Sequence, residues 1–147
     1  MIVVTEVLGR MAGEPAGGRR VEWIVLGFDA MARGHQRVTT DAGTELGISL
    51  ARGGRLAEGD ILYADAERVI AVKAAEDDAL VIRPAEPMQW GLVGFHLGNR
   101  HAAAFFQPGT ILVPYDHTLE ALLSELGVPF HRDRRPLVGV RPYAHAH

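Results

Sequence analysis

Residues 95–117 read FHLGNRHAAAFFQPGTILVPYDH, and this stretch joins two predicted helices through two short predicted strands. Gly98-Asn99 can end the helix that precedes it. Gln107-Pro108-Gly109 is typical of a turn between two strands. Asp116 is a suitable N-cap for the helix that follows. The stretch therefore predicts the order helix, strand, strand, helix.

The residues on either side extend this pattern. Ala79–Arg83 is a predicted strand, and Pro87 suits the first turn of a helix because its missing N–H needs no partner there. Leucines at the spacing i, i+3, i+4, i+7 then predict the buried face of the second helix, which ends at Gly127: Leu119, Leu122, Leu123 and Leu126. With a last strand at Val128–Phe130, the order is β-α-β-β-α-β, that of a ferredoxin-like domain.

The first half of the chain has a different pattern. Strand-like runs separated by turn signals every 8–12 residues or so predict a small all-β barrel or sandwich. Met1–Leu8 is its first predicted strand, and Gln36–Thr40 with Thr44–Leu50 form the clearest predicted hairpin. The acidic run Glu76-Asp77-Asp78 offers little that could pack, so we place the domain boundary there. We thus expect an α+β protein with a β-rich partner-binding domain at 1–75, a metal-binding domain at 76–135 and a flexible tail at 136–147.

Composition narrows the functional classes. The chain has 147 residues, no cysteine and a formal net charge of −3. Its basic residues are dispersed, so we expect neither nucleic acid nor an acidic membrane as a partner. The apolar start Met1–Val4 is too short for a signal peptide, and no stretch approaches the roughly 20 apolar residues of a membrane helix. We expect a cytoplasmic protein.

Histidine is the residue type that suggests a site. Three of the seven histidines fall in residues 95–117, and His145 and His147 lie at the end of the printed sequence. In a chain without cysteine, imidazole is the strongest ligand left for nickel, copper or zinc. An extended tail would place His145 and His147 on the same side. A polar disordered end or an expression remnant would also explain these two residues.

The remaining histidines have alternative explanations. His101 follows the predicted helix end, where it either points at a partner or caps the helix. His117 follows the predicted N-cap and is either a ligand or a solvated residue of the helix start. His96 lies inside the helix and is more simply structural. His35 and His131 stand among arginines and are expected at the surface.

A catalytic role has weak support. Asp116-His117 could act as an acid–base pair, and a zinc hydrolase would use three protein ligands and a water. However, the chain has no His-Glu-x-x-His motif and no serine beside a histidine in a nucleophile motif. The residues favour binding over turnover, so we do not expect an enzyme.

Several motifs together resemble a known family. They are Gln36-Arg37-Val38, Leu56-x-x-Gly59-Asp60, Gly98-Asn99-Arg100-His101, Tyr115-Asp116-His117 and the terminal Tyr143-x-His145-x-His147. Their order and spacing are similar to those of the urease accessory protein UreE family, the nickel metallochaperones of urease maturation. The resemblance covers nearly the whole chain.

The resemblance implies a homodimer that pairs through the C-terminal metal domains. Two copies of His101 at the two-fold axis would share one Ni²⁺ ion, and His145 and His147 would complete its ligand shell. His117 would bind metal in an accessory role, although Tyr115 stands where some members have a second histidine. Zn²⁺ or Cu²⁺ can also bind such ligands. The implied function is delivery of Ni²⁺ to apo-urease through a complex that contains a maturation GTPase. The alternative is a protein- or peptide-binding module with incidental terminal histidines.

Overall fold

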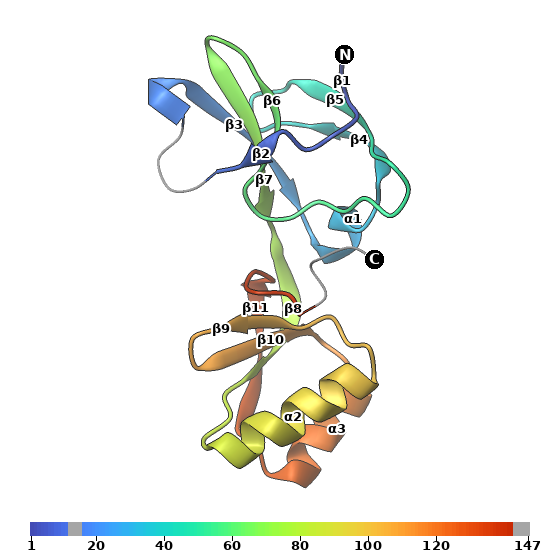
Figure 1. Cartoon of the computed structure of the whole chain (residues 1–147), viewed down its shortest axis with the longest axis vertical. Coiled ribbons are helices and arrows are strands. Elements are labelled where there is room, and N and C mark those ends of the chain that lie inside the picture. The colour runs from blue at the N-terminus through green and yellow to red at the C-terminus, as the bar shows by residue number, and fades with distance from the viewer. Residues whose placement is uncertain (12–15, 143–147) are drawn as a thin grey trace. The chain divides into compact units, whose positions relative to one another are not determined.

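The protein consists of two compact units. The computed structural model describes residues 1–11 and 16–142. The first unit is Met1–Ala75 and the second begins at Glu76. Figure 1 shows strands in both units, with the two longer helices in the second. The prediction of an α+β protein is therefore confirmed.

The first unit contains two sheets. One has the strand order β1-β5-β4, and the other has the order β2-β6-β7-β3. The pairs β1–β5 and β3–β7 are parallel, and the other pairs are antiparallel. The strands are β1 (Ile2–Val4), β2 (Gly9–Arg10), β3 (Arg20–Leu26), β4 (His35–Thr39), β5 (Glu45–Ser49), β6 (Asp60–Ala64) and β7 (Arg68–Ala74). One turn of 3-10 helix, η1 (Ala16–Gly18), precedes β3, and a short helix, α1 (Phe28–Met31), follows it.

Both sheets contribute to one core. Its buried members come from strands of the two sheets and from the loop before β6: Val4, Ile24, Leu26, Leu46, Ile48, Leu50, Leu56, Leu62, Ile70 and Val72. Alternation along β3 turns Glu22 inward together with the apolar residues, and its side chain is only 2% exposed. The Thr40 hydroxyl donates to this carboxylate at 2.7 Å and the Arg68 guanidinium at 3.0 Å. A buried carboxylate is tolerated here because both partners satisfy it.

The predictions for the first unit agree with the structure in part. The predicted hairpin is confirmed, because β4 pairs with β5 in antiparallel register around residues 40–44. The first strand is shorter than predicted and ends at Val4, since only Ile2–Val4 pair with β5. The helix α1 was not predicted because four residues are too few to establish helical periodicity.

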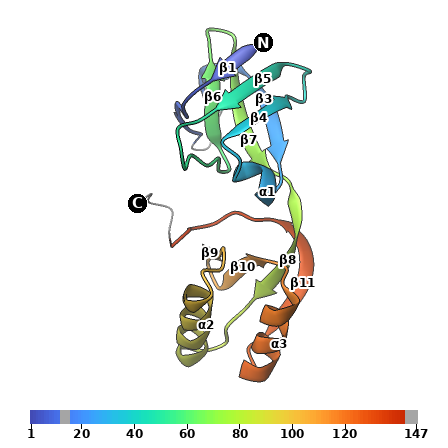
Figure 2. The same ribbon diagram turned by 90° about the vertical axis from the view of Figure 1, so that its right-hand side faces the viewer.

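The second unit has a single four-stranded sheet and two helices. The elements are β8 (Glu76–Ile82), α2 (Pro87–Asn99), β9 (Phe105–Gln107), β10 (Thr110–Pro114), α3 (His117–Leu126) and β11 (Phe130–Pro136). The strand order is β11-β8-β10-β9, and each neighbouring pair is antiparallel. Figure 2 shows α2 and α3 on the same side of the sheet. Their buried residues share one core with the sheet: Val93, Leu97, Leu119 and Leu123 with Leu80, Ile82, Ile111 and Val113.

Two strands of the second unit have other bounds than predicted. Strand β8 includes the acidic run at residues 76–78, before the predicted strand Ala79–Arg83, because β11 places arginines beside this run. Arg132 donates to both carboxylate oxygens of Asp78, from Nε at 2.9 Å and from Nη2 at 2.7 Å. Strand β11 starts at Phe130 and runs on to Pro136, beyond the predicted strand Val128–Phe130. The segment expected as a flexible tail also begins in an ordered way, since Val140 pairs with Phe106 of β9.

Candidate metal site at the ends of α2 and α3

Helix α2 ends in a left-handed residue, and that residue is His101, with a φ of 54°. Its N–H donates to the Gly98 carbonyl at 3.1 Å, and the Ala102 N–H donates to the Leu97 carbonyl at 3.0 Å. This pair of bonds defines a Schellman motif, whose left-handed position usually holds glycine. His101 is the only non-glycine with a positive φ among residues 1–11 and 16–142. Its side chain is exposed, as expected for a residue just past the helix.

The left-handed backbone conformation of His101 is energetically unfavourable for a non-glycine residue. A left-handed conformation disfavours an L-residue by about 1–2 kcal/mol relative to glycine. Such strain is concentrated at functional sites, which makes His101 a candidate functional residue. The alternative prediction, a histidine that caps the helix end, also agrees with this position, because histidine adopts a positive φ more often than most non-glycine residues.

Helix α3 begins beside this end of α2. Asp116 is its N-cap, as predicted: Oδ1 accepts from the Thr118 N–H at 2.8 Å and from the Leu119 N–H at 3.2 Å. The Thr118 hydroxyl also donates to this oxygen, at 2.6 Å. These bonds, led by the one from the Thr118 hydroxyl, hold the pKa of Asp116 below its usual value. His117 is the first helical residue and is exposed.

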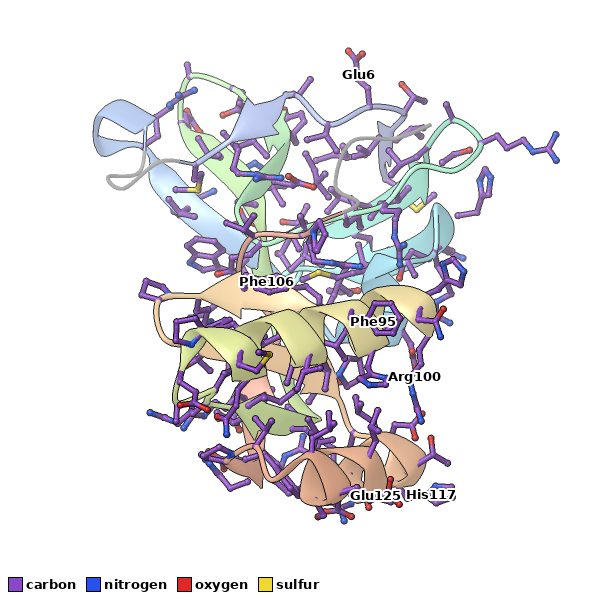
Figure 3. All side chains as sticks on the ribbon, turned by 60° about the horizontal axis from the view of Figure 1, so that its bottom comes forward. Glu6, Phe95, Arg100, Phe106, His117 and Glu125 are labelled. Carbon is purple, nitrogen blue, oxygen red and sulfur yellow. The ribbon has the colours of Figure 1, made fainter. Side chains whose placement is uncertain are left out.

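One side-chain bond joins the two helix ends. The Arg100 guanidinium donates from Nη1 to the Thr118 hydroxyl at 2.9 Å. Figure 3 shows Arg100 and His117 on the same side of this unit. Because Arg100 precedes His101 and Thr118 follows His117, the bond holds the backbone of both histidines in one region of the surface.

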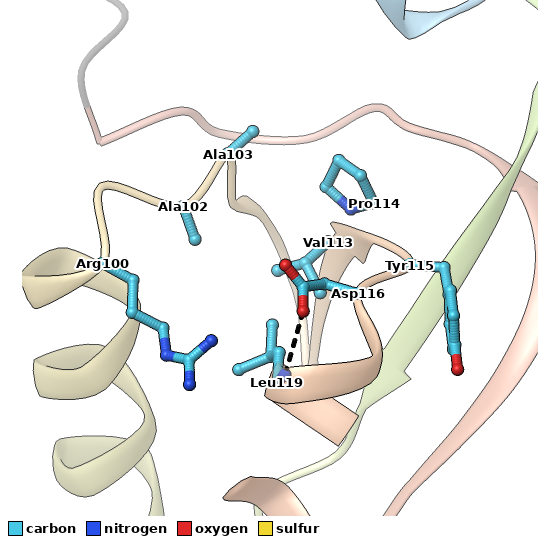
Figure 4. A pocket seen from close by; sticks show the side chains of 8 residues that line it. All are labelled: Arg100, Ala102, Ala103, Val113, Pro114, Tyr115, Asp116 and Leu119. Carbon is cyan, nitrogen blue, oxygen red and sulfur yellow. Dashed lines mark hydrogen bonds between the residues drawn. The ribbon is translucent and has the colours of Figure 1, made fainter. Parts of the chain in front are cut away.

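An open cavity of about 390 Å³ lies between these two ends (Figure 4). Arg100 lies on one side of it and Asp116 on the other. Its wall consists of Arg100, Ala102, Ala103, Val113, Pro114, Tyr115, Asp116 and Leu119. The cavity thus offers one cation, one carboxylate and an otherwise mainly apolar lining next to His101 and His117.

Tyr115 has a structural role in this wall. Its hydroxyl donates to Glu120 Oε1 at 2.9 Å, and the Arg132 guanidinium lies 3.6 Å from its ring centroid. The hydrogen bond to Glu120 is the main cause that raises the pKa of Tyr115. Asp78 holds Arg132 in place, so the ring is fixed between two elements. The residue two before His117 is therefore engaged in packing.

The other histidines in the described residues lie away from this region or are engaged elsewhere. His96 is half-buried in α2, with its ring edge-on to Phe95 at 5.3 Å between centroids. His35 is exposed and its Nδ1 lies 3.1 Å from the Ser49 hydroxyl. His131 is exposed on β11.

Only some of the predicted metal ligands lie in the part of the chain that the structure describes. His145 and His147 lie outside the described residues. Within residues 1–11 and 16–142, no three histidine, aspartate or glutamate side chains are grouped closely enough to hold a metal ion. The two exposed imidazoles at the helix ends, His101 and His117, are the sequence-predicted ligands that can be located.

An apolar stripe on α2 was missed by the sequence interpretation. Met88, Leu92 and Phe95 are 69%, 38% and 66% exposed. They follow the spacing i, i+4, i+7 on one helix face. Two helical glycines, Gly91 and Gly94, have open space where a Cβ would stand. We call Met88, Leu92 and Phe95 the α2 stripe; its spacing was visible in the sequence, but only the structure shows that nothing in the described chain covers it.

These features define a two-unit α+β protein whose exposed imidazoles stand at the adjoining ends of two helices. Two family models match it: UreE urease accessory protein, N-terminal domain, over residues 4–75, and UreE urease accessory protein, C-terminal domain, over residues 76–143. The chain belongs to the UreE family of urease accessory proteins, as the sequence resemblance predicted. Family membership implies an accessory role in urease maturation.

Relatives named urease accessory protein UreE match over most of their length. The one from Bacillus sp. (strain TB-90) is 35% identical over 147 residues, with 99% of each chain covered. The one from Staphylococcus saprophyticus is 37% identical over 149 residues, again with 99% of each chain covered. The one from Geobacillus kaustophilus is 36% identical over 134 residues, or 91% of this chain and 90% of the relative.

Proposed function

We propose that this chain is a homodimeric, cytoplasmic metallochaperone that binds Ni²⁺ and delivers it to apo-urease within a complex that contains a maturation GTPase. The observation that carries the proposal is His101. Its exposed imidazole occupies a left-handed helix-end position that favours glycine. Family membership supports a role in urease maturation, and the exposed imidazole of His101 is a ligand that Ni²⁺ favours.

The donor set suits a metal that is bound and then released. The chain has no thiolate, and imidazole is a good ligand for Ni²⁺, with Zn²⁺ and Cu²⁺ as competitors. One chain offers few located ligands, and a two-fold dimer doubles each of them. We propose that two copies of His101 share one ion, that His145 and His147 complete its shell, and that His117 binds a further ion weakly.

The α2 stripe supports pairing through the second unit. Contiguous apolar surface on a soluble protein marks an interaction site more often than chance exposure does. The stripe runs along the helix that ends at His101, and we propose that a second copy packs on it with the two-fold axis near the C-terminal end of α2, so that two copies of His101 meet. The glycines at positions 91 and 94 leave room for close approach of a second helix.

We also propose a fold type and a role for each of the two units. The antiparallel order β11-β8-β10-β9, with both helices on one side, supports a ferredoxin-like metal-binding domain at 76–135. Two sheets around one core support a small sandwich at 1–75, which we propose as the domain that contacts protein partners. None of the helices within residues 1–11 and 16–142 could span a membrane.

The test is a calorimetric titration of Ni²⁺ into protein of known oligomeric state. Wild type is compared with His101→Ala and with the control His131→Ala, which removes an exposed imidazole on β11. We expect one tight site per two chains that His101→Ala abolishes and His131→Ala leaves unchanged. Tight binding that survives in a dimer of His101→Ala would refute the shared site. Full support of urease activation by that variant would instead favour the protein-binding alternative.

A further inference from the structure

The sheet β1-β5-β4 has one face that is turned away from the core of the first unit (Figure 1). Side chains alternate along each strand, so Leu46 and Ile48 of β5 enter the core while Gly47 faces outward. The registers place Val3 of β1 and Arg37 of β4 on either side of Gly47. Both of these side chains are exposed, so the described part of the chain leaves this face open.

Gly47 leaves the centre of this face without a side chain of its own. A glycine inside a strand often marks a place where another backbone approaches closely. The Met1 side chain lies over it, with Cε 3.2 Å from the position that a Cβ would take. Met1 is 69% exposed, and its unbranched thioether can move aside for a partner. A second extended chain can therefore approach the sheet between Val3 and Arg37.

Arginines gather at the end of the face where β4 begins and β5 ends. The Leu50 N–H donates to the Gly34 carbonyl at 2.8 Å, and a Cβ on Gly34 would lie 3.3 Å from the Gly54 carbonyl oxygen. The segments 33–35 and 50–55 therefore lie side by side, and both carry exposed arginines. We call these residues, with their neighbour on β4, the basic face: Arg33, Arg37, Arg52 and Arg55.

The charges of the basic face have few partners within the chain. Arg37 forms one ion pair, with Glu45 at 3.9 Å, and the two side chains are 74% and 64% exposed. Exposed pairs of this kind contribute little to stability. Within residues 1–11 and 16–142, no carboxylate lies within ion-pair distance of Arg33, Arg52 or Arg55. These guanidinium groups attract a partner of opposite charge.

We propose that the basic face, together with the surface around Gly47, binds an extended acidic segment of a partner protein. The inference rests on the proposed function, since it deepens the role of the first unit as the domain that contacts protein partners. In an extended segment, alternate side chains lie on one side about 7 Å apart, which is also the spacing along each strand of the sheet. Carboxylates at that spacing can meet arginines while the backbone lies over Gly47. Arginine suits this role because its planar guanidinium binds a carboxylate through two parallel hydrogen bonds.

A nucleic acid matches this face less well than a polypeptide does. Single-stranded nucleic acids are held largely by aromatic side chains that stack on their bases. The outward positions of the three strands contain no phenylalanine, tyrosine or tryptophan: Val3, His35, Arg37, Thr39, Glu45, Gly47 and Ser49. The positive charge of the face is therefore not accompanied by the stacking groups that a nucleic acid needs.

The first test measures binding of a fluorescent peptide, (Glu-Thr)5, to the full chain by anisotropy at low salt. Arg37→Glu with Arg52→Glu reverses two charges of the basic face, and both positions are exposed, so the fold should be kept. The control, Lys73→Glu with Arg83→Glu, makes the same change in net charge at exposed positions outside the face. We expect saturable binding that the first variant weakens about 10-fold or more, because each lost pair is worth a few-fold and reversal adds repulsion. The control should bind as the wild type does.

Four results would overturn the proposal. The wild type does not bind the acidic peptide, or the two variants bind it equally well. The neutral peptide (Gln-Thr)5 binds as tightly as the acidic one, so the carboxylates are not what is recognised. A ten-nucleotide oligothymidylate binds more tightly than the acidic peptide, which would assign the face to nucleic acid.

The second test probes the approach of the partner backbone over Gly47. In Gly47→Val the new side chain meets only the end of the flexible Met1 side chain, and valine favours strands, so the fold should be kept. We expect the affinity for the acidic peptide to fall about 5-fold or more, because the added side chain blocks close approach. Thr39→Val, at another exposed position of this face, should leave the affinity unchanged. An unchanged affinity in Gly47→Val would refute the binding position over β5.

Titration with Ni²⁺ separates this inference from the proposed metallochaperone. The variant Arg37→Glu with Arg52→Glu should bind Ni²⁺ as the wild type does, because neither residue is a proposed ligand. Loss of peptide binding with unchanged Ni²⁺ binding supports the inference. Absence of peptide binding in a wild-type protein that binds Ni²⁺ refutes the inference alone, and absence of Ni²⁺ binding refutes the metallochaperone whatever the peptide does.

Discussion

Replacing His101 by glycine should stabilise the protein while it removes the proposed ligand. His101 has a φ of 54° at the left-handed position of the Schellman motif that ends α2. Glycine adopts this conformation without the steric cost that an L-residue meets, about 1–2 kcal/mol. A typical surface substitution has no such effect, so a gain in stability here would be diagnostic.

The expected gain is smaller than the full steric cost. Glycine also has more conformational freedom in the unfolded chain, which lowers the free energy of unfolding by about 0.4–1 kcal/mol. The net increase in the free energy of unfolding should be about 0.5–1 kcal/mol. For a domain of this size that corresponds to a rise in the melting temperature of about 2–8 °C. His101→Ala should show no such rise, because alanine keeps the left-handed cost.

The assay is thermal unfolding of the metal-free protein, followed by circular dichroism in the presence of a chelator. Protein concentration is held constant, since dimerisation would otherwise change the apparent stability. Gly127 is the matched control: it is left-handed at the end of α3, with φ 67° and open space for a Cβ. Gly127→Ala should lose about 1 kcal/mol. A His101→Gly variant less stable than His101→Ala would refute the strain argument.

Three further predictions concern the cap, the buried carboxylate and the α2 stripe. Asp116→Ala should lower the free energy of unfolding by about 1 kcal/mol in urea titrations, and Asp116→Asn by much less, because asparagine also caps. The pKa of Glu22 is lowered from 4.5 to about 2, with the Thr40 hydroxyl as the largest cause. Its carboxylate therefore stabilises the folded state fully above about pH 4.5, and this contribution, up to about 3 kcal/mol, is lost as the pH falls toward 2. Glu22→Gln should flatten that part of the stability–pH curve; an unchanged slope would contradict the assignment. Phe95→Asp should shift sedimentation toward the monomer, whereas Val3→Asp, at an equally exposed position with 67% against 66% exposure, should not.

The helix boundaries of the second unit could largely be predicted from local sequence signals. Pro87 at the helix start, Asp116 as N-cap and Gly127 as the left-handed C-cap all act where the sequence predicted. Each signal works through atoms within a few residues, so a sequence displays it directly. The central hairpin of the first unit was predictable for the same reason.

Contacts between distant residues were not predictable in this way. The acidic start of β8 became a strand because Arg132, far along the chain, neutralises Asp78. Glu22 is buried because Thr40 and Arg68 converge on it from two other segments. No local pattern encodes such partners, and an isolated acidic run is more typical of an exposed segment.

By itself, the sequence determined the order of most elements, the α+β class and the family, and it predicted the imidazole of His101 as the leading metal ligand. Those conclusions depend on short-range propensities and on motifs whose residues are close in the chain. Only the tertiary structure decided that His101 takes a left-handed conformation, that Arg100 joins the ends of α2 and α3, and that Gly139 lets the chain at Val140 pair with Phe106 of β9. These features depend on backbone geometry and on contacts between segments far apart in sequence, which become defined only when the chain packs.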